Sequence, residues 1–274
     1  MSRFADLHIH THYSDGTLSP QEVIADAHAQ GLSCIAITDH DTVDGIAPAL
    51  EAAEEFAIEV VPGIELSSEI DGKDVHILGY FFDYKNKAFV KMIERMQSSR
   101  VGRMGKMIEK LRTLGINNIS LEEVRERTLS GSVGRPHLAA ILQEKGWVVS
   151  IQDAFDRYLA NDAPAYVSKF QQTPYEAIKL IQDFGGIPVL AHPMLTNVDE
   201  LIAGFVSAGL RGLEVYYPNC TDNVTRFYKG LAKQYNLIAT GGSDAHGSVK
   251  KHTFIGKIKI PYLIVEQLKT DCHR

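Results

Sequence analysis

The feature that most constrains the fold is a series of short apolar runs separated by helical sequence. Several runs are continuously hydrophobic, as expected for strands covered on both faces. Ser19-Pro20 and Thr173-Pro174 open two of the helical segments, and Glu follows at the third helical position of each, which is a helix-start signal. Alternating strand and helix predicts a parallel α/β sheet closed as a barrel. The predicted strands are residues 4–10, 34–39, 59–65, 75–81, 187–192, 212–216 and 237–244.

The alternation stops between residues 84 and 165. A long helical stretch, 87–114, comes first, Ser120 then opens a second helix, and no strand-like run follows before residue 165. This pattern predicts a helical, substrate-binding subdomain of residues 84–165, inserted into a barrel domain of residues 1–83 and 166–274. The length of 274 residues suits one barrel, typically about 250 residues, that carries an insertion.

Charge and cysteine content set the expected compartment. Charged residues appear already at Arg3 and Asp6, and no stretch approaches the roughly 18 uninterrupted apolar residues that a membrane span needs. The three cysteines are odd in number and far apart, which argues against a disulfide framework and against a zinc-thiolate site. We therefore expect a cytoplasmic protein that is neither secreted nor embedded in a membrane.

The formal net charge of −6 is unevenly distributed along the chain. Residues 84–135 carry twelve Lys or Arg against five Glu, which is +7, so the rest of the chain carries −13. The overall negative charge argues against tight binding of duplex DNA, whereas the basic segment suits a small anionic substrate or a short single strand.

Six of the eleven histidines lie in or at the ends of predicted strands, which is where barrel enzymes assemble their active sites. His8 and His10 alternate with Ile9, so both point to the same side of one strand. Imidazole and carboxylate ligands without thiolate suit zinc, manganese or iron(II). The histidines and acidic residues at these positions are too many for one ion, which indicates a site for two or three metal ions. The ligand-type residues at strand ends are His8, His10, Asp39, His40, Glu65, His76, His192, Asp244 and His246.

These strand-end motifs resemble those of the PHP (polymerase and histidinol phosphatase) family. The motifs are the run from His8 to Thr17, Ile37-Thr38-Asp39-His40-Asp41, Pro62-Gly63-Ile64-Glu65, Ala191-His192-Pro193 and Gly242-Ser243-Asp244-Ala245-His246. The resemblance implies a distorted (β/α)7 barrel that holds up to three divalent ions, with manganese expected and zinc or iron(II) as alternatives. Asp6 and Asp39 adjoin ligands and are expected to orient imidazoles, with a structural role as a cap or turn acid as the alternative. The implied ligand sets are His8, His10, Glu65 and Asp244 for one ion, Glu65, His76 and His192 for a second, and Asp15, His40 and His246 for a third.

Residues 133–139 and 165–169 resemble one subgroup of this family, the phosphoesterases of small nucleotides and RNA 5′ ends, which include 3′,5′-nucleoside bisphosphate phosphatases. The helical insertion fits the same subgroup. The resemblance implies that Arg135 binds a phosphate in a bidentate manner, that Lys169 adds a point charge, and that His137 donates to the phosphate or to the leaving group. Arg100 and Arg103 lie three apart on one helix face and either reach a second phosphate or an RNA backbone, or form a solvated face.

These features together predict a metal-dependent hydrolase that cleaves a phosphate ester by attack of a hydroxide held between metal ions. The implied substrate is a nucleoside 3′,5′-bisphosphate or the 5′ end of a short RNA. Three alternatives stay open. Histidinol-phosphate phosphatase is disfavoured by the motif around Arg135, and an amidohydrolase would not need Arg135 and Lys169. A non-catalytic metal-binding accessory module should have lost some of its ligands.

Overall fold

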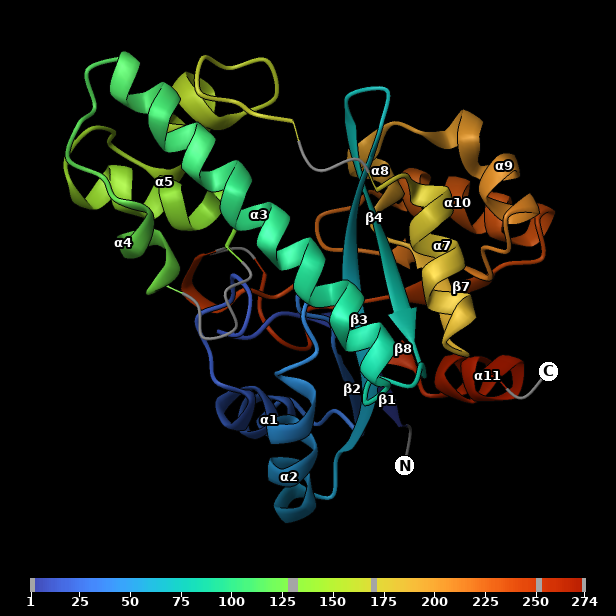
Figure 1. Cartoon of the computed structure of the whole chain (residues 1–274). Coiled ribbons are helices and arrows are strands. Elements are labelled where there is room, and N and C mark those ends of the chain that lie inside the picture. Colours follow the sequence, from blue (N-terminus) through green and yellow to red (C-terminus); the bar gives the residue numbers. More distant parts are fainter. Residues whose placement is uncertain (1–2, 128–132, 169–171, 250–252, 273–274) are drawn as a thin grey trace.

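One sheet of eight strands curls into a barrel with helices on its outside (Figure 1). The computed structural model describes residues 3–127, 133–168, 172–249 and 253–272. The strands are β1 (Phe4–Ile9), β2 (Cys34–Ile37), β3 (Glu59–Ile70), β4 (Lys73–Tyr80), β5 (Ile187–Leu190), β6 (Gly212–Tyr216), β7 (Ile238–Gly241) and β8 (Ile260–Pro261). They lie in the order β7-β6-β5-β4-β3-β2-β1-β8. The barrel closes where the backbone N–H of His10, after β1, donates to the carbonyl of Ala245, after β7, at 3.0 Å.

The direction of β4 differs from the all-parallel sheet that the sequence predicts. Strands β1 to β3 are mutually parallel, as are β5 to β7, but β4 is antiparallel to both β3 and β5. Only Asp71 and Gly72 separate β3 from β4, and their φ angles are +50° and +74°. Asp-Gly with two positive φ angles is the type I′ turn that reverses a chain between paired strands. The prediction was therefore wrong for β4, and this dipeptide was the signal that it overlooked.

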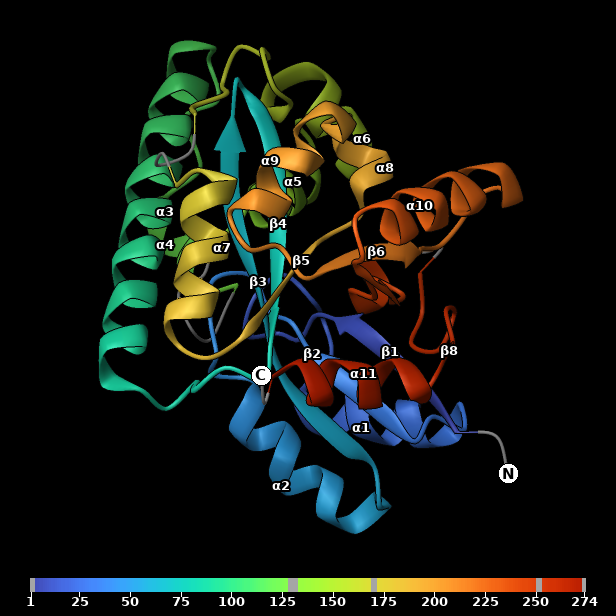
Figure 2. The ribbon, with the colours of Figure 1, turned by 90° about the vertical axis from the view of Figure 1, so that its right-hand side faces the viewer.

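Helices cover the barrel and build the insertion (Figure 2). The predicted capping boxes are confirmed, since the hydroxyls of Ser19 and Thr173 each accept a hydrogen bond from the N–H of the following Glu at 3.2 Å. Among the described residues, no helix is both long and apolar enough to cross a membrane. The helices are α1 (Pro20–Ala29), α2 (Ile46–Phe56), α3 (Lys87–Thr113), α4 (Leu121–Arg125), α5 (Arg135–Glu144), α6 (Ile151–Ala154), α7 (Pro174–Asp183), α8 (Pro193–Thr196), α9 (Ile202–Ser207), α10 (Asp222–Gln234) and α11 (Leu263–Cys272), with a π-helical turn at Phe155–Leu159.

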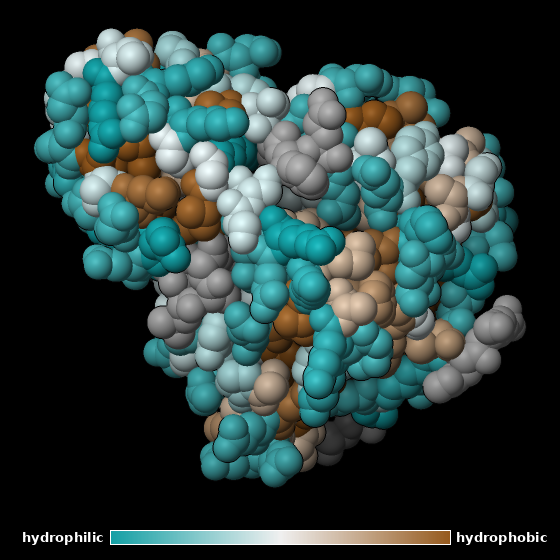
Figure 3. Space-filling view, in the orientation of Figure 1, coloured by the Kyte–Doolittle hydropathy of each residue, from teal (hydrophilic) through white to brown (hydrophobic). Residues whose placement is uncertain are grey.

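Helix α3 belongs to two hydrophobic cores. Phe89 and Ile93, near its start, pack into the barrel core together with Ile181 of α7. Met107 and Leu111, near its end, pack into a separate core that the inserted helices form among themselves. Its 27 residues span about 40 Å at 1.5 Å per residue, and it runs past the β3-β4 hairpin out to α4 and α5 (Figure 1). The insertion is therefore joined to the barrel by a continuous helix and stands out as a separate lobe of the molecular surface (Figure 3).

Candidate metal centre and its cleft

Four buried side chains form a first donor group, which we call group 1 and which consists of His8, His10, Glu65 and Asp244. The Nε2 atoms of His8 and His10 are 3.1 Å apart, and Glu65 Oε2 lies 3.2 Å and 3.1 Å from them. Asp244 Oδ1 completes the group at 3.5 Å and 3.3 Å from the same two nitrogens. Both imidazoles reach this point because side chains two residues apart on a strand share a face.

Group 1 has the dimensions of a metal site. A tetrahedral site with metal–ligand distances of about 2.0–2.2 Å places neighbouring ligand atoms about 3.3–3.6 Å apart. The interatomic distances of 3.1–3.5 Å in group 1 lie at or just below this edge length. Two imidazole nitrogens that face each other at 3.1 Å also require a cation or a proton between them, because their lone pairs repel. The donor set therefore fits a divalent ion.

The two oxygens of Glu65 face different imidazoles. Oε2 belongs to group 1 and also lies 3.3 Å from His40 Nδ1. Oε1 lies 2.8 Å from His76 Nδ1 and 2.9 Å from His192 Nε2. We call His40, Glu65 and His76 group 2; the sequence-based set had His192 in place of His40. A carboxylate shared between two donor groups is suited to bridging two metal ions.

A third donor group, group 3, consists of His10, Asp15, His40 and His246. His246 Nε2 lies 3.3 Å from Asp15 Oδ1, and His40 Nε2 lies 3.9 Å from Asp15 Oδ2. His10 adds its Nδ1, which lies 3.8 Å from Asp15 Oδ1 and has no hydrogen-bond partner among the described residues. The structure thus brings together the three residues of the predicted third set and adds His10, whose two ring nitrogens face two different groups.

Opposing effects of burial and charge act on the pKa values in these groups. Burial lowers the pKa of His10, but its contacts with Asp244 and Glu65 outweigh burial and raise that pKa to about 9. The pKa of His8 is also held well above its usual value, because Glu214, Glu65 and Asp244 outweigh burial. Burial would raise the pKa of Glu65, yet the surrounding imidazoles hold it well below its usual range. The carboxylates therefore remain ionised and favour a cation among them, either a proton or a metal ion.

Two side chains outside the donor groups fix the orientation of ligands. Glu214, fully buried on β6, accepts from His8 Nδ1 through Oε1 at 2.9 Å and from the backbone N–H of His192 through Oε2 at 2.8 Å. Tyr217 donates its hydroxyl to Asp244 Oδ2 at 2.7 Å, which leaves Oδ1 turned to group 1. The position of Glu214 at a strand end was a weak sequence signal for this role. Tyr217 was missed, although it also follows β6.

The structure gives Asp6 and Asp39 a different role from the predicted one. Asp6 accepts hydrogen bonds from the backbone N–H groups of Ser243 at 2.8 Å and Gly256 at 2.9 Å. Asp39 accepts from the N–H of Thr11 at 2.7 Å and from its hydroxyl at 2.6 Å. Both carboxylates therefore hold the backbone of segments that carry ligands. The prediction that they orient imidazoles was wrong, because the loops turn backbone donors toward them.

Arg135, which the sequence assigns to phosphate binding, lies in the cleft but is held by protein groups. Its Nη2 donates to Asp74 Oδ2 at 2.7 Å. Its Nη1 donates to the carbonyl of Leu159 at 3.1 Å and to Asn161 Oδ1 at 3.0 Å. These contacts fix the guanidinium at the start of α5. Lys169, the second predicted phosphate ligand, lies outside the described residues.

His137 is held by protein groups at the start of α5. Its Nδ1 accepts from the backbone N–H of Gly134 at 3.0 Å, which caps the start of α5. Burial lowers the pKa of His137, while the charge of Asp15 and a hydrogen bond to the Ser14 backbone oppose that change. These contacts tie the insertion to the loop that carries Asp15. The donation of His137 to the phosphate or to the leaving group stays a prediction.

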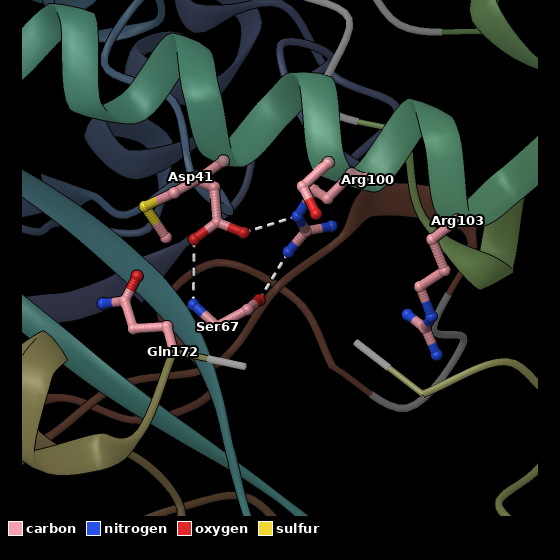
Figure 4. Close-up of a pocket in the computed structure, with 7 residues that line it drawn as sticks. Asp41, Ser67, Arg100, Arg103 and Gln172 are labelled. Atoms are coloured by element: carbon pink, nitrogen blue, oxygen red, sulfur yellow. Dashed lines mark hydrogen bonds and ion pairs between the residues drawn. The ribbon is translucent and has the colours of Figure 1, made fainter. Parts of the chain in front are cut away.

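Arg100 likewise binds protein groups, which is neither of the two alternatives that the sequence left open for it, a phosphate contact or a solvated helix face. Its Nε donates to the Asp41 carboxylate and its Nη2 to the Ser67 hydroxyl (Figure 4). Its Nη1 donates to the carbonyl of Val133 at 3.2 Å. The second Asp41 oxygen accepts from the Ser67 N–H at 2.8 Å. Arg100 therefore fastens α3 to the loop after His40 and to the turn that precedes Arg135.

A cleft of about 210 Å³ lies between the barrel and the insertion. Groups 2 and 3 contribute one side of it, with Asp15, His40, His76 and His246 in its lining. The insertion contributes the other side, which is cationic because Arg100, Arg103 and Arg135 line it. An anion in this cleft would lie between donor groups suited to metal ions and a wall of guanidinium groups.

Comparison with known proteins gives consistent matches. Residues 6–158 match the family model described as PHP domain. A 5′-3′ exoribonuclease of Haemophilus influenzae is 34% identical over 251 residues, which cover 90% of this chain and 91% of that protein. A 3′,5′-nucleoside bisphosphate phosphatase of Chromobacterium violaceum is 32% identical over 246 residues, which cover 88% and 86%. A solved structure from Bifidobacterium adolescentis, named as a metal-dependent phosphoesterase, matches with a TM-score of 0.88 and 29% identity over 97% of this chain and 95% of that one.

The family match covers β1 to β4 and most of the insertion, and the matched relatives extend through the rest of the barrel. The predicted α/β barrel fold, with its helical insertion, agrees with the solved structure. The clustered imidazoles and carboxylates supply the donors that a metal-dependent phosphoesterase requires. The chain therefore belongs to the PHP family and is a metal-dependent hydrolase of phosphate esters.

Proposed function

We propose that the protein hydrolyses a phosphate ester of a small nucleotide, either a nucleoside 3′,5′-bisphosphate or the 5′ end of a short RNA. The observation that carries this proposal is the cleft in which metal-donor groups face three arginines. A phosphate is the common chemical group that both sides of such a cleft bind. The names of the two matched relatives support a nucleotide over histidinol phosphate as the substrate.

The proposed centre holds two or three divalent ions, with manganese expected and zinc or iron(II) as alternatives. Three overlapping donor groups support this number, since they share Glu65, His10 and His40. The ligands proposed for the centre are His8, His10, Asp15, His40, Glu65, His76, His192, Asp244 and His246. When bound, such ions polarise the phosphate and lower the pKa of water.

The side chains of the protein have separable roles in this proposal. Glu214 and Tyr217 keep His8 and Asp244 in orientation through the hydrogen bonds at 2.9 Å and 2.7 Å. Arg135, held by Asp74, presents a fixed positive charge to the phosphate. Preorganised charge of this kind stabilises a phosphoryl group that gains negative charge during the reaction.

We propose that residues 84–165 act as the substrate-binding subdomain and that residues 1–83 and 166–274 carry the metal centre. The separate hydrophobic core of the inserted helices supports this division. The contribution of Arg103 and Arg135 to the cleft supports a direct role of the insertion in binding. Arg103 lies on α3 and Arg135 at the start of α5, so both cations belong to the proposed subdomain.

The test of the proposed function is phosphate or nucleotide release in the presence of manganese. Adenosine 3′,5′-bisphosphate, a 5′-phosphorylated short RNA and histidinol phosphate are compared, each with and without a chelator. We expect turnover of at least one nucleotide substrate that the chelator abolishes, and the ratio of the two nucleotide rates separates a phosphatase from an exonuclease. Turnover of histidinol phosphate alone would overturn the nucleotide assignment. His10→Ala is the matched variant, and full activity in it would refute the site.

A further inference from the structure

The three arginines of the cleft differ in how many of their donors the protein itself uses. All three guanidinium nitrogens of Arg100 donate, to Asp41, Ser67 and Val133. Both terminal nitrogens of Arg135 donate as well, one of them to Asp74. These two side chains are therefore held in place by protein acceptors and, as they stand, have few donors left for a ligand.

Arg103 has a guanidinium nitrogen that no other described residue uses. Its Nε donates to the carbonyl of Val167 at 2.6 Å, but its buried Nη2 has no hydrogen-bond partner among the described residues. Figure 4 shows its side chain apart from the Arg100 cluster, with no interaction marked between Arg103 and the other residues drawn. Burial, together with the nearby charge of Arg135, lowers the pKa of Arg103 to about 10, so it remains a cation at neutral pH. A partly desolvated cation with an unused donor is stabilised when an anion binds it.

Arg103 borders two hollows of the molecule. It lines the cleft and also the small neighbouring cavity of Figure 4, together with Ser67 and Gln172. None of the described residues that line this cavity belongs to groups 1 to 3, whereas Arg135 lines the cleft but not the cavity. Arg103 therefore lies where the cleft meets this cavity, as Arg100 also does. A group of the substrate bound there would be distinct from the phosphate held at the metal centre.

We propose that Arg103 determines substrate specificity by binding a second phosphate of the substrate, the one that is not hydrolysed. This inference rests on the proposed function, because it assumes that the scissile phosphate lies at the donor groups. The substrate class that fits is a nucleotide with two phosphates on one sugar. The 5′ end of an RNA strand also fits if its next phosphodiester group occupies the position of the second phosphate. The planar guanidinium suits two oxygens of such a phosphate.

The test compares a bisphosphate with the monophosphate that keeps only the hydrolysed group. The wild-type product, adenosine 5′- or 3′-monophosphate, identifies which phosphate leaves the bisphosphate and hence which monophosphate is the comparison substrate. Steady-state constants are measured for wild type, Arg103→Gln, Arg103→Lys and Arg95→Gln with manganese. Arg95 is the matched control, because it is an exposed arginine of the same helix that lines an outer groove instead of the cleft.

We expect Arg103→Gln to lower kcat/KM for the bisphosphate about 10- to 100-fold, mainly through KM, as for a lost charge-assisted hydrogen bond. Its activity on the monophosphate should change less than about threefold, or about 0.7 kcal/mol, because that substrate lacks the phosphate that Arg103 is proposed to bind. Arg95→Gln should behave like wild type, and Arg103→Lys should recover part of the loss. If the Gln variant does not fold, the Lys variant must still show the selective loss.

Three results would overturn the inference. An equal loss on both substrates would make Arg103 a ligand of the scissile phosphate or a structural residue, and no loss on either would leave the second subsite without function. A wild type that prefers the monophosphate would also contradict a second-phosphate site while leaving phosphoesterase activity in place. Absence of wild-type turnover on every nucleotide would refute the proposed function itself, so the two failures are distinguishable.

Discussion

Replacement of Glu214 by glutamine tests whether the metal centre depends on a carboxylate that is not itself a predicted ligand. Glu214 is fully buried and contacts His8 Nδ1 at 2.9 Å and the backbone N–H of His192 at 2.8 Å. Glutamine keeps the shape and one carbonyl oxygen but loses the negative charge. One of the two hydrogen bonds then has an amide NH2 in place of an acceptor, so the His8 ring loses its fixed orientation or the chain at His192 moves.

The expected magnitude follows from what such partners do at metal sites. Loss of the hydrogen-bond partner of a metal-bound histidine lowers metal affinity about 10- to 100-fold, which is about 1.4–2.8 kcal/mol. A second effect opposes this loss. Burial lowers the pKa of His8, and among the charged groups Glu214 raises that pKa the most. Protons therefore compete with a metal ion for His8 more strongly in the wild type than in the variant. We therefore expect the difference in affinity between wild type and variant to grow as pH rises and protons leave His8.

The assay is competition for manganese or zinc with a chromophoric chelator at several pH values. Glu266→Gln, which removes an exposed carboxylate on α11, is the control and should bind metal like wild type. Thermal unfolding in the presence of a chelator checks that the Glu214 variant is folded. Equal metal affinity of folded wild type and variant across the pH range would refute the orienting role of Glu214.

Three further predictions follow from the contacts around the site. Metal binding at pH 7 should release protons, because the pKa of metal-free His10 is raised to about 9. Calorimetry in buffers of different ionisation enthalpy measures the number of protons released. The apparent metal affinity should also rise as the pH approaches about 9. Asp41→Asn should lower the free energy of unfolding by about 1.5–3 kcal/mol in urea, because it removes the charged partner of Arg100. Gly242→Ala should destabilise the barrel by about 1–3 kcal/mol, since its methyl group would lie 2.3 Å from His8 Cβ.

Each of these three predictions has a result that contradicts it. A binding heat that does not depend on the buffer would show that the metal-free imidazoles are already neutral. An unchanged urea midpoint for the Asp41 variant would mean that Arg100 finds equivalent partners. The control for the glycine variant is Gly230→Ala on α10, where an added methyl group meets nothing within 4 Å. Equal stability of the two glycine variants would rule out close packing at Gly242.

The parts of the site that the sequence predicted are those that depend on local periodicity. His8 and His10 share a strand face whatever the rest of the chain does, and strand ends of a barrel meet at one point. The orientation of Arg100 was not predictable in this way, because its partner Asp41 is 59 residues away and belongs to another element. The antiparallel direction of β4 was predictable from the Asp71-Gly72 turn, but hydrophobic runs alone do not carry direction.

The hydrogen-bond partners of individual side chains were the least predictable from the sequence. Arg135 and His137 were both expected to face the substrate, but nothing in the sequence indicated that Asp74 would hold the first or that the second would accept from Gly134. Such partners depend on how the insertion docks onto the barrel. Many acceptors along the chain compete for each donor, and only the folded structure shows which of them lies within hydrogen-bond distance.

The most direct test of the central claim is to measure phosphate release from adenosine 3′,5′-bisphosphate as a function of the manganese bound per chain. Metal-free protein is loaded stepwise, bound metal is determined by elemental analysis, and activity is measured at each step. We expect no turnover in the metal-free protein and full turnover only when two or three ions are bound. Full activity with less than one ion per chain, or after complete removal of metal, would contradict a reaction that depends on the donor groups.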